Sequence, residues 1–265
     1  MRQAVVIAGF LLLGTAYALA EPYEVAYEGD VFPEEVGWER FTSGGGAERS
    51  VAGGLLALSS DDPLVADQYR FDAQGALDAG PGEFFYAEWR MRLLPGSGIA
   101  DVNVSIYRDA GQGDIWLGFS TDFVISFLDD NRIDPIDTTI WRDYRIVSFD
   151  MVNYDFFIDG AYADSGFFAF PGLADAKVWF GDCCIGQASS SEWDYFRFGA
   201  ATAGDVNTDG RVNLADFATF AICFGAPVGS PATSCSDVEA HTSDLNGDEI
   251  IDLGDFAIFA QNFGA

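Results

Sequence analysis

Oxygen-bearing side chains recur with the same spacing in two segments near the end of the sequence. In each segment they fill positions 1, 3, 5, 9 and 12 of a twelve-residue stretch, and position 7 would offer its backbone carbonyl. A loop with this spacing wraps six or seven oxygens around a hard cation. The expected ligands of a first calcium ion are Asp205, Asn207, Asp209, Arg211, Asn213 and Asp216. The expected ligands of a second calcium ion are Asp244, Asn246, Asp248, Ile250, Asp252 and Asp255.

Each of these loops leads into an amphipathic helix. One Leu and three Phe follow at intervals of three, three and four residues, which places them on one helical face. These residues are Leu214, Phe217, Phe220 and Phe224 in the first copy, and Leu253, Phe256, Phe259 and Phe263 in the second. The pattern predicts a calcium loop plus one helix per copy, without the long entering helix of a full EF-hand.

The doubled loop-plus-helix resembles a type I dockerin over nearly all of residues 204–265. Dockerins dock onto cohesin modules in cellulose-degrading complexes, so the resemblance implies a cohesin-like partner, with docking onto the chain's own β domain as the alternative. Two features depart from the family. Glu249 stands at position 6, where Gly usually allows a sharp turn, and Leu214-Ala215 and Leu253-Gly254 replace the hydroxyl pair often used for cohesin contact. The first loop is therefore expected to bind calcium more tightly than the second.

Residues 21–200 show the pattern of a β protein throughout. Short alternating runs are bounded by Gly, Asp, Pro and Ser, and the clearest covers residues 84–93, with alternate residues Phe85 to Leu93 on one face. Many short strands over about 180 residues predict an antiparallel β-sandwich or jelly roll. The chain is thus expected to be mainly β, with an export signal at 1–20, the sandwich at 21–200 and a small α-helical dockerin-like domain at 201–265.

Several segments resemble the concanavalin-like and laminin-G-like jelly roll. They are a strand that begins near Trp141, the run Tyr154-Asp-Phe-Phe-Ile-Asp-Gly160 with Asp-Gly as a hairpin turn, and closing strands around Trp179 and Trp193. Members of this superfamily bind glycans or proteins, cleave polysaccharides, or act as structural modules. The resemblance therefore predicts the fold and leaves the function open.

Composition excludes several classes of function. The chain has 42 acidic and 13 basic residues, which argues against binding to nucleic acid or to anionic membranes. It contains one lysine, Lys177, and one histidine, His241, so chemistry that needs a histidine base is poorly supplied. No segment after the N-terminal run approaches eighteen apolar residues, and no membrane span is expected.

The first twenty residues are typical of an export signal. Arg2 precedes an apolar run, and Ala18-Leu-Ala20 is a small-x-small cleavage pattern; a buried N-terminal helix is the alternative. We expect a secreted or cell-surface protein, in which cysteines can form disulfides. Cys223 and Cys235 are expected to pair across the linker between the two loops. The adjacent Cys183 and Cys184 form either a vicinal disulfide or two free thiols.

Catalytic carboxylates are not evident from linear spacing. Glycan-cleaving enzymes need two carboxylates across a cleft, yet Glu88 stands alone in its strand and Glu192 and Asp194 flank a strand that resembles structural ones. The sequence therefore predicts no enzyme but a binding or structural module, with a carbohydrate or another extracellular molecule as its ligand. The alternative is a polysaccharide-degrading glycoside hydrolase that carries a docking module.

Aromatic residues supply the means to bind a sugar. Trp89, Trp141 and Trp179 alternate with strand partners, a pattern that favours the core. Trp116, near Asp114 and Gly118, is the candidate for stacking on a glycan ring.

Overall fold

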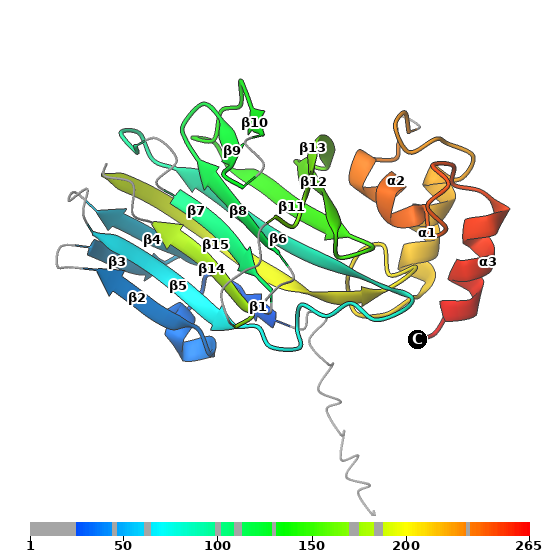
Figure 1. Ribbon diagram of the computed structural model, residues 1–265, viewed down its shortest axis with the longest axis horizontal. Coiled ribbons are helices and arrows are strands. Elements are labelled where there is room, and N and C mark those ends of the chain that lie inside the picture. Colours follow the sequence, from blue (N-terminus) through cyan, green and yellow to red (C-terminus); the bar gives the residue numbers. More distant parts are fainter. Residues whose placement is uncertain are drawn as a thin grey trace, which may run out of the picture.

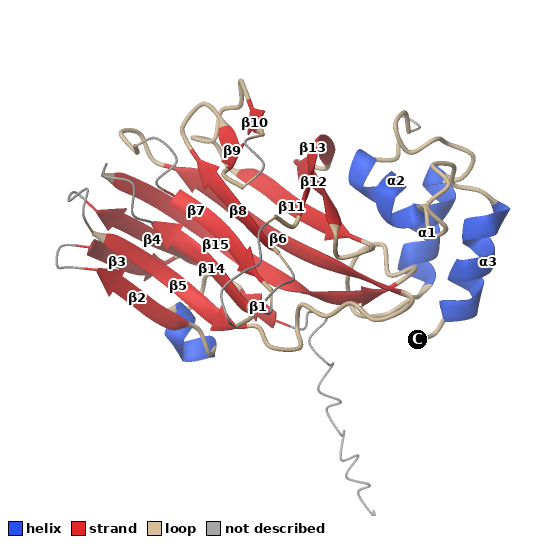
Figure 2. Ribbon diagram, in the orientation of Figure 1, coloured by secondary structure: helices blue, strands red, loops and turns tan. Residues whose placement is uncertain are grey.

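The computed structural model describes residues 25–43, 47–60, 65–98, 102–108, 113–128, 131–169, 175–182, 188–231 and 234–265. The expected export signal at 1–20 and the pair Cys183 and Cys184 lie outside these residues. Two antiparallel sheets pack face to face, and a helical tail lies at one end of them (Figure 1). The predicted β-sandwich with a small helical C-terminal part is confirmed (Figure 2). Among the described helices, none has the length and apolar character needed to cross a membrane.

The eight-stranded sheet follows the order β13-β12-β11-β6-β15-β4-β3, and β1 pairs with β15. Its strands are β1 (Val25–Tyr27), β3 (Ala47–Ala52), β4 (Leu55–Ser60), β6 (Glu83–Leu93), β11 (Arg142–Ser148), β12 (Asn153–Ile158), β13 (Ala161–Phe167) and β15 (Ser189–Thr202). The 3-10 helix η1 (Pro33–Val36) precedes β2.

The seven-stranded sheet follows the order β10-β9-β8-β7-β14-β5-β2. Its strands are β2 (Glu39–Ser43), β5 (Ala66–Asp72), β7 (Val102–Tyr107), β8 (Asp114–Phe119), β9 (Val124–Ser126), β10 (Arg132–Ile133) and β14 (Lys177–Asp182). Strands distant in sequence are neighbours in both sheets, so side chains on one face come from widely separated segments.

The core lies between the two sheets, as the alternation in β6 predicts. The inward side chains of β6 from Phe85 to Leu93 are fully buried. Trp89 stacks on Phe196 and Tyr144 at centroid distances of 5.5 and 5.7 Å, which adds ring contacts to the burial of apolar area. The expectation that Trp89 belongs to the core is confirmed.

The turn between β12 and β13 is the expected Asp-Gly hairpin. Asp159 and Gly160 have φ angles of 53° and 78°, the left-handed pair that a tight hairpin turn requires. The Gly160 carbonyl accepts a hydrogen bond from the backbone N–H of Val238, at 3.2 Å. The hairpin therefore also holds the tail.

The tail contains the two expected helices, α1 (Leu214–Cys223) and α3 (Leu253–Asn262). Their phenylalanines pack against each other, with Phe220 and Phe259 stacked at 5.6 Å. A third helix, α2 (Asp237–Ser243), was not expected from the sequence. Ser236 and Glu239 form its capping box, so the Ser-x-x-Glu spacing was a usable signal for it.

Helix α2 rests on the outer face of the eight-stranded sheet. Its Val238 packs against a buried apolar patch whose members are Phe84, Tyr86, Val147, Phe157 and Ala201. Asn262 at the end of α3 donates a hydrogen bond to the Ala203 carbonyl, at 2.8 Å. The tail thus docks onto its own sandwich.

Cys223 and Cys235 form the expected disulfide, with their Cα atoms 5.2 Å apart. The bond joins the end of α1 to the segment that enters α2. Reduction should lower the free energy of unfolding of the tail by about 3 kcal/mol, because closing a loop of this length restricts the unfolded chain. Denaturant unfolding followed by helical circular dichroism would measure the loss. In the double variant Cys223→Ala/Cys235→Ala, adding reductant should change nothing further; a continued response would assign the effect to other cysteines.

Candidate functional site

The first loop gathers three carboxylates into one cluster. Oxygens of Asp205, Asp209 and Asp216 lie within 4.8 Å of one another. Backbone N–H groups hold them there: Asp205 accepts from Asp209 and Gly210 at 3.0 and 2.9 Å. Asp216 accepts from the N–H groups of Asn207 and Asn213 at 3.1 and 2.9 Å. Hydrogen bonds from the loop backbone thus hold the Asp205 and Asp216 carboxylates in place without a bound ion.

The second loop repeats this arrangement. Oxygens of Asp244, Asp248 and Asp255 also lie within 4.8 Å of one another. The N–H groups of Asp248 and Glu249 donate to Asp244 at 3.2 and 2.9 Å. Asp255 accepts from the N–H groups of residues 246 and 252 at 3.1 and 2.7 Å. The two copies of the sequence motif therefore form two carboxylate clusters of the same geometry.

These carboxylates are buried close to like charges. Asp205, Asp216 and Asp255 are at most 1% exposed. Burial raises the pKa of Asp205 to about 7, and the nearby Asp216 carboxylate adds to the shift. Burial likewise raises the pKa of Asp216 and of Asp244. A hard cation with oxygen ligands would offset this cost, so the residues present fit calcium.

The remaining expected ligands are not part of the two carboxylate clusters. Asn213 and Asp252 at position 9 cap the helices that follow, accepting from the N–H groups of Ala215 and Gly254 at 2.8 and 2.6 Å. Position 9 often reaches the ion through a water, which a capping side chain permits. The Arg211 carbonyl at position 7 accepts from the Asn213 amide at 3.2 Å. Its counterpart in the second loop is Ile250, half exposed.

The amides at position 3 face the wrong way for a cation. Asn207 and Asn246 direct their nitrogens at the neighbouring carboxylates of Asp209 and Asp248, at 3.3 and 3.2 Å. Binding through their oxygens would require each amide to turn.

The two loops differ at the tight turn, as the sequence indicated. Gly210 has φ of 80°, and Glu249 at the matching position has φ of 68°. The left-handed region is readily available to glycine and costs a residue with a side chain about 1–2 kcal/mol. Each loop therefore has one left-handed residue with a side chain: Glu249 at position 6 of the second loop, and Thr208 at position 4 of the first, with φ of 54° where the second loop has Gly247.

The exposed part of the eight-stranded sheet is a network of ion pairs. Glu88 lies 3.3 Å from Arg197 and 3.9 Å from Arg145, and Arg197 also binds Glu28 at 2.6 Å. Glu192 pairs with Arg92 at 2.6 Å. Carboxylates neutralised in this way suit a structural role better than acid–base chemistry.

The outer face of the seven-stranded sheet has a different character, and we call it the tryptophan face. Trp179 on β14 and Trp116 on β8 both pair in register with Ser105 on the strand between them. Both indole N–H groups lack a hydrogen-bond partner among the described residues. In the adjacent row, buried Gln68 donates to Asn103 at 2.9 Å. Aromatic rings beside buried polar groups are the usual composition of a site for a small organic ligand.

Two tryptophans expected in the core lie outside it, which corrects the sequence-based prediction. Trp179 is half-buried between Tyr107 and Phe41, at centroid distances of 5.8 and 5.9 Å. Trp141 lies under the guanidinium of Arg92, 5.0 Å from the ring centroid. Strand β14, and strand β11 that follows Trp141, carry other large side chains on the inward face, so burial of these rings was not needed to fill the core.

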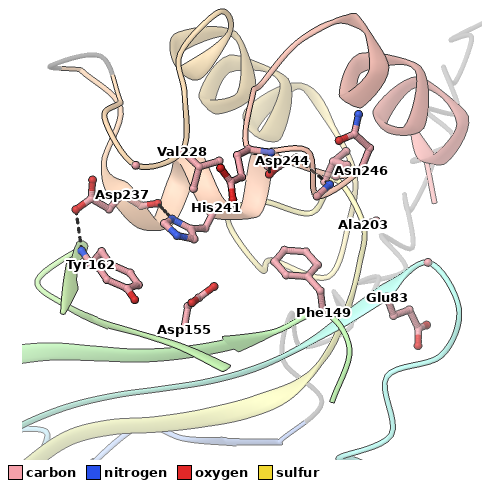
Figure 3. A pocket seen from close by; sticks show the side chains of 15 residues that line it. Glu83, Phe149, Asp155, Tyr162, Ala203, Val228, Asp237, His241, Asp244 and Asn246 are labelled. Atoms are coloured by element: carbon pink, nitrogen blue, oxygen red, sulfur yellow. Dashed lines mark hydrogen bonds between the residues drawn. The ribbon is translucent and has the colours of Figure 1, made fainter. Parts of the chain in front are cut away.

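A cavity of about 810 Å³ lies between the tail and the eight-stranded sheet (Figure 3). Asp155 and Tyr162 from the sandwich face His241 of α2 across it. The His241 ring stacks on Tyr162 at 5.6 Å, and the Tyr162 N–H donates to Asp237 at 2.8 Å. No sequence pattern predicted this site, because its walls come from the sandwich and from helix α2, which was not expected.

Solved structures share this architecture at low sequence identity. A carbohydrate esterase from the Shiga toxin-encoding bacteriophage phi24B has a TM-score of 0.52 and 13% identity, over 66% of this chain and 97% of that one. A prokaryotic β-1,3-1,4-glucanase (lichenase) from a mouse hindgut metagenome has a TM-score of 0.47 and 16% identity, over 66% and 98% of the two chains. At such identities the likeness shows the fold. No family model and no curated protein matches the sequence.

The expectation that the chain is not an enzyme is wrong. A structure of the same fold is described as a carbohydrate esterase, so the fold is compatible with catalysis. The prediction failed because it searched for two carboxylates within one strand. In a sandwich, sheet pairing brings together side chains from strands distant in sequence, and linear spacing does not reveal them.

Calcium should stabilise the tail of the full chain. The metal-free clusters hold buried like charges, whereas a bound ion at a hundred times its dissociation constant adds about 2.7 kcal/mol per site. Thermal unfolding with calcium and with a chelator would show a shift in the transition of the tail. Asp205→Asn and Asp244→Asn should each remove part of the shift, and the double variant all of it. An equal shift in the double variant would contradict the assignment.

Glu249→Gly should strengthen calcium binding at the second loop about fivefold, because glycine removes a backbone cost of about 1 kcal/mol. Calorimetric titration of the variant and the parent chain would measure the difference. Gly210→Glu is the matched change in the first loop and should weaken binding there. Weaker binding by Glu249→Gly would instead show that the Glu249 carboxylate contributes to the ion site.

Proposed function

We propose that the sandwich is a carbohydrate-active enzyme that hydrolyses a polysaccharide held across the tryptophan face. The observation that carries the proposal is the pairing of Trp116 and Trp179 on either side of Ser105. Strand spacing places the two tryptophans about 9.6 Å apart across the sheet. Two rings at a fixed separation can stack on two sugar units of one chain, and buried amides beside them can recognise hydroxyl groups.

Asp114 is the proposed catalytic acid. It pairs in register with Tyr107 at the edge of the tryptophan face and is 7% exposed. Burial raises the pKa of Asp114, although a backbone N–H from Arg108 opposes the shift. A carboxyl group with a raised pKa keeps its proton closer to neutral pH, as general-acid catalysis requires.

In hydrolysis, the glycosidic carbon–oxygen bond breaks and the oxygen of a water joins the anomeric carbon. Asp114 would give its proton to the departing sugar oxygen, and the water would return a proton to the site. The shared architecture with a carbohydrate esterase supports a substrate of this class.

For the tail we propose a dockerin-like module that folds around two calcium ions in an exported protein. Its contacts with the sandwich leave other apolar side chains in solvent, and Leu214 and Leu253 are each 72% exposed. These leucines occupy matching places in the two repeats. A cohesin-like partner would have to bind this free side of α1 and α3.

Incubation with a panel of extracellular polysaccharides should release reducing ends. Trp116→Ala and Trp179→Ala should each lower kcat/KM about fivefold or more, since aromatic stacking contributes of order 1 kcal/mol or more. Asp114→Asn should lower kcat by at least about a hundredfold, in line with the usual size of general-acid catalysis. Trp141→Ala, beside β11 of the other sheet, is the matched control. Absorbance of unsaturated products would show that the reaction is elimination and not hydrolysis. Release of acid without chain cleavage would show that the enzyme cleaves an ester.

The pH profile should also carry the signature of Asp114. The acid works only when protonated, so activity should fall as pH rises through its raised pKa and persist at pH values where an ordinary aspartate has lost its proton. An activity that rises steadily with pH across this range would exclude Asp114 as the acid.

A further inference from the structure

The cavity between sandwich and tail has a floor and a roof of different origin (Figure 3). Phe149, Asp155 and Tyr162 of the sandwich form the floor. His241 and the second calcium loop form the roof. A volume of about 810 Å³ is within the range that holds a small organic molecule. This site lies on the opposite sheet from the tryptophan face.

The described lining of the cavity is strongly acidic. Its described lining contains five carboxylates and no lysine or arginine, and those carboxylates belong to Glu83, Asp155, Asp237, Asp244 and Glu249. Several already accept backbone hydrogen bonds: Glu83 from Gly80, Asp237 from Tyr162, and Asp244 from the second loop. Asp155 accepts no such bond among those the structure shows. Its surroundings favour a positive ligand.

Asp155 occupies a distinctive place within this lining. It lies on the floor between the rings of Phe149 and Tyr162, each 43% exposed (Figure 3). Burial raises the pKa of Asp155, and the charge of His241 opposes the shift. The His241 Nδ1 is 2.7 Å from the Asp237 carbonyl, which can only accept, so Nδ1 donates this hydrogen bond.

We propose that this cavity binds the ammonium group of an amine-bearing ligand, with Asp155 as its counter-ion and Phe149 and Tyr162 as its aromatic walls. An ammonium beside a carboxylate forms a charge-assisted hydrogen bond, and aromatic faces attract it further. The chemistry is shared by amino sugars and by aliphatic polyamines. The site is independent of the reaction proposed for the tryptophan face.

Calorimetry of the full chain in saturating calcium would test the assignment. Three probes separate the sources of the amine: a glucosamine tetramer, the same tetramer fully N-acetylated, and spermidine. The glucosamine tetramer or spermidine should bind, and the acetylated tetramer, which has the same backbone without the charge, should not. Binding of the glucosamine tetramer alone identifies an amino sugar, and binding of spermidine alone identifies a polyamine. Equal binding of charged and acetylated tetramers, or binding of none of the probes, would overturn the proposal.

Variants locate the binding event. Asp155→Asn should weaken binding by at least about tenfold, the usual loss when a charge-assisted hydrogen bond loses its charged partner. Tyr162→Phe should bind nearly as the parent does, and Tyr162→Ala should bind more weakly. Glu48→Gln, an exposed acid on β3 at the far end of the same sheet, makes the same change of charge and should bind normally. If Asp155→Asn unfolds the chain, comparing the affinity of Tyr162→Ala with that of Tyr162→Phe still tests the site. Full affinity in Asp155→Asn, or in Tyr162→Ala, would refute the site.

Discussion

The position of the tail depends on the packing of one short helix against a sheet. Helix α2 packs Val238 against an apolar patch on the eight-stranded sheet. Its direction is fixed by two hydrogen bonds, from the Val238 N–H to the Gly160 carbonyl and from the Tyr162 N–H to the Asp237 carboxylate. The disulfide ties its start to α1, and Asp244 of the second loop caps its end. Helix α2 alone is too short to be stable in water, so the sandwich and the tail each supply part of its stability.

This packing gives the two outer faces of the sandwich different properties. Part of the eight-stranded sheet is covered by the tail, and ion pairs around Glu88 neutralise much of the remainder. The opposite sheet keeps half-buried Trp116 and Trp179 beside buried amides. The proposed substrate face therefore lies on the sheet opposite the one on which α2 packs. In this arrangement the tail and the proposed substrate face occupy different surfaces of the sandwich.

The sequence contained most of the fold and only part of the site. Alternation in β6, the Asp159-Gly160 turn and the repeated loops are local patterns, and each appears as predicted. Period two shows which residues share a face of a strand, but it does not show which face is inside, and Trp179 was therefore misplaced. The position of Asp155 opposite His241 depends on how the tail packs against the sandwich. No local pattern reports such docking, although the Ser236–Glu239 cap could have revealed α2.

Asp244 belongs to two sites at once. Its carboxylate is part of the second ion cluster, and the same residue lines the cavity beside the sandwich. The first cluster has no member in that lining. Suppose that a ligand in the cavity changes the affinity of the second loop for its ion by some factor. Thermodynamic reciprocity then requires that the ion change the affinity of the cavity for that ligand by the same factor. The two copies of the motif would thus differ in function. Ion binding at the second copy would respond to a ligand in the cavity, and the first copy shares no residue with the cavity.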